Sequence, residues 1–174
     1  EFLDAIKRKP ITETEVQKVG AMCASCAEIG QIIQGSRPVH ASGRRISDVP
    51  LQGTTANFAS LQNLDIVAGR YFTELENEHA APVAVIGSEI REELFPRLDP
   101  VGRTVWIGDA PHRVIGLLAK QGSVLGNNPD LQIYVPYRAA QKQVGRGHHR
   151  LGEGQVPLFI RPPGGAPGGD QPHK

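Results

Sequence analysis

The most reactive side chains in the sequence are two cysteines, Cys23 and Cys26, which are separated by two residues. A Cys-x-x-Cys pair can act as a redox couple, supply half of a zinc site or close a local disulfide. A zinc site needs a second pair of cysteines or histidines, and none follows at a suitable spacing. Redox catalysis needs a thiolate, which the start of a helix stabilises, whereas the helical pattern of residues 12–26 puts both cysteines near its end. The spacing favours buried core residues or a local disulfide, with thiol-redox chemistry and metal binding as alternatives.

A second chemical candidate is the strand-glycine-helix pattern around Gly87, which is how a dinucleotide-binding unit begins. The apolar residues 83–86 predict a short buried strand, and Ser88 is expected to cap the helix that follows. A dinucleotide fingerprint needs two further glycines, but Glu89 and Glu92 stand at those positions. Their carboxylates would repel a phosphate, so we expect a capped helix packed on a strand and no bound nucleotide.

The histidines and acidic residues do not form a recognisable active site. None of the six histidines has a histidine or cysteine three or four residues away. His112 lies in an alternating stretch, which predicts an exposed position on a β-hairpin. Glu74, Glu76 and Glu78 are expected to form a solvated acidic loop. The sequence contains no nucleophile elbow of the G-x-S-x-G type, so we expect no enzymatic activity.

Composition narrows the class of protein further. The 174 residues are 39% hydrophobic and 21% charged, which is typical of a folded domain. The net charge of +1 lacks the basic surplus of nucleic-acid-binding proteins, so we exclude nucleic acid as a partner. No run of 18 apolar residues occurs, and the chain begins with Glu1 rather than methionine. We expect it to be a segment of a longer protein.

The elements that must position these residues alternate irregularly between helix and strand, which predicts an α+β fold. Thr12 and Glu15 form a capping box before a helix over residues 12–26, whose apolar stripe includes Met22. Pro50 interrupts a predicted strand and suggests an edge or a bend. Residues 108–111 are expected to connect two hairpin strands. The other expected elements are strands within 28–42, a helix over 56–64, a strand over 131–137, a helix over 137–144 and an edge strand over 156–161.

Several linked motifs between residues 50 and 144 occur in the order found in a known family. They are a Gly-Arg-aromatic-Phe-Thr step, a V-A-V-I-G strand, a helix ending in Leu-Phe, an Asp-Pro-x-Gly turn, a V-I-G-L-L strand and a strand-Pro-helix close. Their most distinctive residues are Gly69, Arg70, Phe72, Gly87, Phe95, Pro100, Gly102 and Pro136. In these motifs the sequence resembles the extracytoplasmic (periplasmic core) domain of MacB-like or FtsX-like ABC transporter permeases.

The resemblance implies a porter-like subdomain into which a mostly β, sabre-like subdomain is inserted. We assign residues 1–61 and 154–161 to the porter-like part, residues 62–144 to the sabre-like part and residues 145–153 to a loop. Residues 162–174, of which eight are Gly or Pro, are expected to be a disordered tail. In the oxidising periplasm that the resemblance implies, Cys23 and Cys26 would be bridged.

The resemblance also implies a function without catalysis, cofactor or metal. Such domains lie on the periplasmic side of the inner membrane, as part of a multi-pass permease that is dimeric, and we expect the isolated domain to be monomeric. They transmit the conformational change driven by a cytoplasmic ATPase and dock a periplasmic adaptor (membrane fusion) protein, which connects to an outer-membrane channel. A lipoprotein-release or cell-division-type FtsX-like permease is the alternative within the class. A small thiol-redox protein using Cys23 and Cys26 is the alternative from another class.

Overall fold

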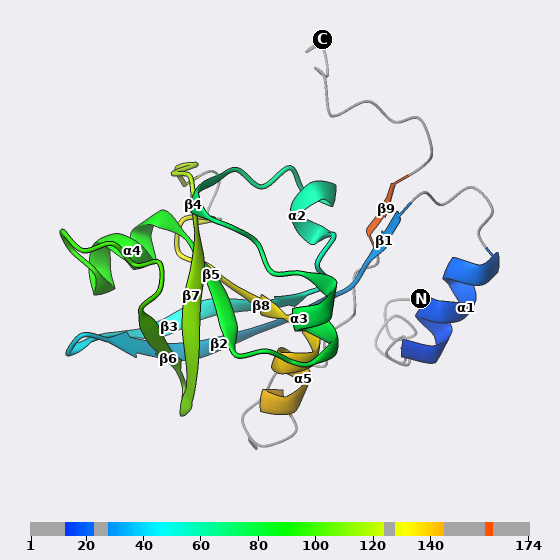
Figure 1. Cartoon of the computed structure of the whole chain (residues 1–174), viewed down its shortest axis with the longest axis horizontal. Helices are drawn as coiled ribbons and strands as arrows, with labels where there is room; N and C mark the ends of the chain where they lie inside the picture. Colours follow the sequence, from blue (N-terminus) through cyan, green and yellow to red (C-terminus); the bar gives the residue numbers. More distant parts are fainter. Residues whose placement is uncertain (1–12, 23–27, 124–127, 145–158, 162–174) are drawn as a thin grey trace, which may run out of the picture.

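The computed structural model describes residues 13–22, 28–123, 128–144 and 159–161 (Figure 1). Most of these residues belong to a mixed seven-stranded sheet with strand order β4-β7-β5-β8-β3-β2-β6. In chain order the strands are β2 (Ile32–Ala41), β3 (Arg44–Thr54), β4 (Ile66–Gly69), β5 (Val83–Ile86), β6 (Thr104–Ile107), β7 (Ala110–Leu118) and β8 (Ile133–Pro136). The β3–β8 and β5–β7 pairs are parallel and the other pairs are antiparallel, while β6 pairs with both β2 and β7.

Five helices accompany the sheet in the described part of the chain: α1 (Glu13–Met22), α2 (Phe58–Leu61), α3 (Glu74–Glu78), α4 (Ser88–Leu94) and α5 (Tyr137–Val144). A second, two-stranded sheet pairs β1 (Glu28–Gly30) with β9 (Phe159–Arg161) in antiparallel register. Figure 1 shows β1 leading directly into β2, so the small sheet adjoins the N-terminal end of β2 in the large sheet. The mixture of helices and strands confirms the predicted α+β class.

The two faces of the large sheet carry separate apolar clusters. Along β5, Ala84 and Ile86 belong to one cluster and Val85, between them, belongs to the other. This is the alternation that a strand with both faces covered must show. Ile90 of α4 and Ala140 of α5 pack into the first cluster, and Phe58 of α2, Phe72 and Tyr134 pack into the second. The core therefore extends over both faces.

Sheet membership bears on the expected division into subdomains. Strands β2 and β3, expected in the porter-like part, pair with β6 and β8, which lie in the expected sabre-like part. The small β1–β9 sheet instead joins residues 28–30 to residues 159–161. Strands of both expected parts therefore share one sheet, and the division at residue 61 stays a prediction. The expected loop 145–153 and tail 162–174 lie outside the described residues.

Several local predictions were wrong for identifiable reasons. Strand β3 is not an edge strand, because β2 and β8 flank it, although pairing with β8 begins only at Leu51, directly after Pro50. The β6–β7 hairpin turns over two residues instead of four, since Ile107 already pairs with Ala110. The α4 helix is capped by Gly87, and Ser88 is its first residue.

Helices α3 and α1 bear on two further predictions. The acidic residues 74–78 form α3 and not a loop, because Thr73 and Glu76 make a capping box that the sequence reading missed. Helix α1 is described as far as Met22, and residues 23–26 of the predicted helix lie outside the described residues. Met22 is 84% exposed, so it does not face a core formed by the described residues.

Candidate functional site

The predicted Gly-Arg-aromatic-Phe step lies at the end of β4, which pairs antiparallel with β7, and we call the close backbone contact between the two strands at this point the crossing. Gly69 has φ +70°, and a Cβ atom built on it would lie 2.0 Å from the carbonyl oxygen of Ile115. On the facing strand, a Cβ atom on Gly116 would lie 2.3 Å from the carbonyl oxygen of Arg70. The Arg70 amide donates to the Ile115 carbonyl at 2.9 Å. Two backbones thus approach so closely that neither position accepts a side chain, and Gly69 needs glycine for its φ angle as well.

The side chain of Arg70 links this crossing to helix α3. Its guanidinium donates two parallel hydrogen bonds to the Glu76 carboxylate, both at 2.8 Å, and a third to the Tyr71 carbonyl at 3.1 Å. The hydrogen bonds from Arg70 lower the pKa of Glu76 to about 2, against the opposing effect of partial burial. The Glu76 carboxylate also accepts the Thr73 amide at 2.8 Å. One ion pair therefore fixes the turn that leaves β4.

Gly87 lies against the loop before β8. A Cβ atom at this position would lie 2.2 Å from the carbonyl oxygen of Asp130, and the Gly87 amide donates to the Gln132 carbonyl at 2.9 Å. The Glu89 amide, at the start of α4, donates to the Asp130 carbonyl at 3.0 Å. A protein carbonyl thus accepts one of the backbone amides at the helix start that a phosphate would need.

The remaining motif residues also lie in structural positions. Phe72 is 3% exposed and stacks on Tyr71 with ring centroids 4.2 Å apart, while Phe95 is fully buried in the other cluster. Gly102 has φ +88°, and its amide donates to the Val114 carbonyl at 2.7 Å. The two motif prolines are Pro100, which is buried, and Pro136, which ends β8 opposite Thr54.

The predicted exposed position of His112 on the hairpin was wrong, because the residue is only 3% exposed. Its Nδ1 lies 3.1 Å from the Ala110 carbonyl and its Nε2 lies 2.9 Å from the Gln143 amide nitrogen of α5. Because an amide nitrogen can only donate, Nε2 accepts and the proton sits on Nδ1. Burial lowers the pKa of His112. Cys23 and Cys26, the strongest chemical candidates, lie outside the described residues.

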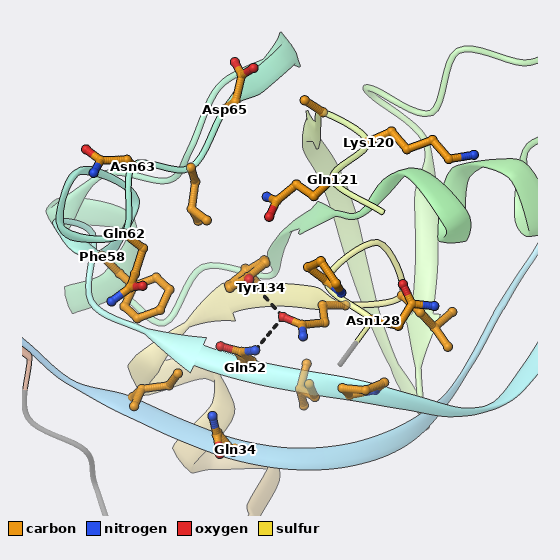
Figure 2. A pocket seen from close by; sticks show the side chains of 18 of the residues that line it. Gln34, Gln52, Phe58, Gln62, Asn63, Asp65, Lys120, Gln121, Asn128 and Tyr134 are labelled. Atoms are coloured by element: carbon orange, nitrogen blue, oxygen red, sulfur yellow. Dashed lines mark hydrogen bonds between the residues drawn. The ribbon is translucent and has the colours of Figure 1, made fainter. Parts of the chain in front are cut away.

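The structure reveals a hollow that the sequence analysis missed, a polar groove of about 810 Å³. Its floor is formed by β2, β3 and β8, and its walls by residues 62–65 after α2 and by residues 119–121 and 128–132 (Figure 2). Side-chain amides are the most numerous polar groups in its lining: Gln34, Gln52, Gln62, Asn63, Gln121, Asn128 and Gln132. These residues are spread over the whole fold, so no local sequence pattern could have joined them.

The groove can form hydrogen bonds but is poorly equipped for acid–base chemistry. The only carboxylate and the only ammonium among its lining residues are Asp65 and Lys120. Burial raises the pKa of the Tyr134 hydroxyl to about 12, which makes it a hydrogen-bond donor at neutral pH. Within the described ranges there is also no group of three or more His, Cys, Asp or Glu residues that could hold a metal ion. No described helix is long and apolar enough to cross a bilayer.

Comparison with known proteins agrees with this architecture. The family profile described as "MacB-like periplasmic core domain" matches residues 4–165. The macrolide export ATP-binding/permease protein MacB of Nitrosomonas europaea is 42% identical over 81 residues, which is 45% of this chain and 12% of that protein. The pyoverdine export ATP-binding/permease protein PvdT of Pseudomonas aeruginosa is 40% identical over 89 residues, which is 51% of this chain and 13% of that protein. The chain thus matches only 12% to 13% of the length of these curated relatives.

Two solved structures share the fold at low sequence identity. The periplasmic region of MacB from Actinobacillus actinomycetemcomitans superimposes with a TM-score of 0.73 at 16% identity, covering 93% of this chain and 70% of that one. The extracellular domain of the ABC-type transporter YknZ from Gram-positive bacteria gives 0.70 at 19% identity, covering 87% and 73%. With a family profile that spans most of its length, the chain belongs to the MacB-like periplasmic core domains of ABC transporter permeases, outside the cytoplasmic membrane.

Proposed function

We propose that this domain is a non-catalytic extracytoplasmic element of an ABC export permease. In this role it transmits the conformational change driven by ATP hydrolysis across the membrane and docks a periplasmic partner. Membership of the family supports this class of protein, and the names of two relatives include both export and ATP binding. Within the described residues, the motif side chains brace the fold rather than surround a reacting atom.

The observation that carries the proposal is the braced crossing at Gly69 and Arg70. A body passes on a movement without loss only if it does not deform, and a densely packed core is nearly incompressible. Here the contact between β4 and β7 is as close as two backbones allow, and the Arg70–Glu76 pair ties it to α3. Such a body suits a part that is moved as a unit.

The partners follow from the class of transporter. A cytoplasmic ATPase would act on the domain through the parent permease, which we expect to be dimeric, and a periplasmic adaptor protein with an outer-membrane channel would complete the exporter. A lipoprotein-release or cell-division-type FtsX-like permease is a variant with the same mechanics and another partner.

The test uses the full-length permease with its ATPase and adaptor. The variant Gly116→Ala disturbs the crossing, and Gly102→Ala is the matched control, since a Cβ atom at Gly102 has no neighbour within 4 Å. We expect Gly116→Ala, at an equal level in the membrane, to keep ATP hydrolysis and lose most of the export, whereas Gly102→Ala changes both little. Replacing residues 32–144 with a flexible Gly-Ser linker should abolish export entirely. Export that survives this replacement would contradict the proposal.

A further inference from the structure

We propose that the polar groove is a binding site for a neutral ligand rich in hydroxyl groups, of the saccharide class. The groove holds about 810 Å³, within the usual range of ligand pockets. This inference is independent of the proposed function, because it concerns binding by the domain itself.

The floor of the groove contains an amide that is fixed in one orientation. Gln132 is only 8% exposed, and its Oε1 accepts hydrogen bonds from Gln52 Nε2 at 2.6 Å and from the Tyr134 hydroxyl at 2.9 Å (Figure 2). Both lone pairs of this oxygen are therefore used. The Nε2 of Gln132 keeps two hydrogens and makes no hydrogen bond to any residue that the structure describes. A donor with a fixed direction costs little entropy on binding.

The rim supplies further amides that are free to bind. Gln34, Gln62, Asn63 and Gln121 are exposed, and their side chains form no hydrogen bond within the described ranges. Each amide offers both donors and an acceptor, which matches a hydroxyl group that also donates and accepts. Figure 2 shows Gln62 and Gln121 on different walls of the same hollow, so one ligand could contact both.

The charge of the groove selects a neutral ligand. Asp65 and Lys120 contribute one negative and one positive charge, and the lining contains no arginine. An anionic ligand such as a phosphate ester would lack the paired cationic donors that it needs. A cationic ligand would find only one carboxylate, Asp65, among the lining residues. The lining therefore favours a ligand whose polar groups are neutral, such as hydroxyl or amide groups.

The floor also argues against an extended peptide. In β-strand addition a peptide pairs with free backbone groups at a sheet edge. Here Gln52 of β3 is paired on both sides, with Gln34 of β2 and with Tyr134 of β8. The floor therefore presents side chains to the ligand, and recognition depends on amide groups above an apolar base that includes Phe58.

The walls are held in place before any ligand binds. The Asp130 carboxylate accepts the backbone amides of Gln121 and Gly122, both at 2.8 Å. Burial acts to raise the pKa of Asp130, but these amide hydrogen bonds together with other neighbours such as Lys120 lower it, so the anchor stays charged. The Ala119 amide donates to the Asp65 carbonyl at 2.9 Å, which ties the two walls together. A preorganised groove loses less entropy when it binds.

The test titrates the 174-residue chain with uncharged trisaccharides, namely maltotriose, cellotriose and N-acetylglucosamine trimer, by calorimetry and by NMR shifts. A sulfated disaccharide and an uncharged Gly-Ala tetrapeptide represent the other ligand classes. We expect at least one uncharged trisaccharide to bind and to shift the amide signals of Gln121 and Gln132. The proposal is overturned if none binds, or if the sulfated sugar or the peptide binds more tightly.

Variants assign the binding to the groove. Gln121→Ala and Gln62→Ala change exposed side chains and should leave the fold intact. Each should weaken binding about 3- to 10-fold, the effect of one lost neutral hydrogen bond. The control is Gln141→Ala on α5, which does not line the groove. Equal affinities for Gln121→Ala and the control would refute the site.

Discussion

Three glycine-to-alanine substitutions separate the two reasons for which this fold needs glycine. At Gly102 the φ angle of +88° is the only obstacle, because a Cβ atom would meet nothing within 4 Å. That strain costs about 1 kcal/mol. At Gly116 the obstacle is contact, since the new Cβ atom would lie 2.3 Å from the Arg70 carbonyl oxygen. Forcing the strands apart costs about 1–3 kcal/mol. Gly69 has both obstacles, with φ +70° and a contact of 2.0 Å, so its substitution should cost about 3 kcal/mol.

Urea unfolding of the isolated chain, followed by circular dichroism, measures these costs as shifts of the midpoint at constant m-value. Thermal midpoints should fall by about 2–4 °C for Gly102→Ala and by about 6–12 °C for Gly69→Ala. The order of the three variants is the decisive result. If Gly69→Ala is no less stable than Gly102→Ala, the close crossing of β4 and β7 does not hold the fold, and the argument for a rigid body fails.

Three further predictions concern ionisable groups. Because Arg70 lowers the pKa of Glu76 from 4.5 to about 2, the pair stabilises the fold above pH 4.5 and this contribution disappears as the pH falls toward 2. The half-exposed Arg70 limits it to less than about 1 kcal/mol, so the stability of Glu76→Gln should approach that of the parent chain in acid, and a constant difference would contradict this origin. His112 is buried and its pKa is lowered, so only the unfolded chain takes up a proton just below pH 6.5, and stability should fall there as the pH drops. His112→Gln should remove this dependence, and an unchanged slope would disprove the cause. Cys23 and Cys26 should give no free thiol when the unreduced, denatured chain is titrated, and two free thiols would exclude the disulfide.

Elements that depend on neighbouring residues could be predicted from the sequence. A short apolar run predicts the strand over 83–86, and Gly87 marks the start of the helix that follows. Pro136 marks the end of strand β8. These are local signals, and the structure has the elements where the signals predict them.

Features that depend on contacts between residues far apart in the sequence could not be predicted from such local signals. The alternation along β7 puts His112 on the same face as the buried Val114, so an inward position could have been predicted. The hydrogen bond to its ring could not, because Gln143 of α5 comes from far along the chain. The order of the strands, which joins β3 to β8 in parallel, also has no local signal. The same applies to the groove, where Gln52 and Gln132 meet across 80 residues of sequence.

The junction before β2 connects these findings to the proposed mechanics. Only Gln31 separates β1 from β2, and its amide donates to Thr55 Oγ1 at 3.1 Å. The Asn57 side chain donates to the Ile29 carbonyl at 3.0 Å, so the loop after β3 holds both strands. A Cβ atom on Gly30 would lie 2.7 Å from a Leu61 methyl group, so α2 packs directly on β1. A displacement of the small sheet must therefore move α2 and the wall that follows it, which is also a wall of the groove.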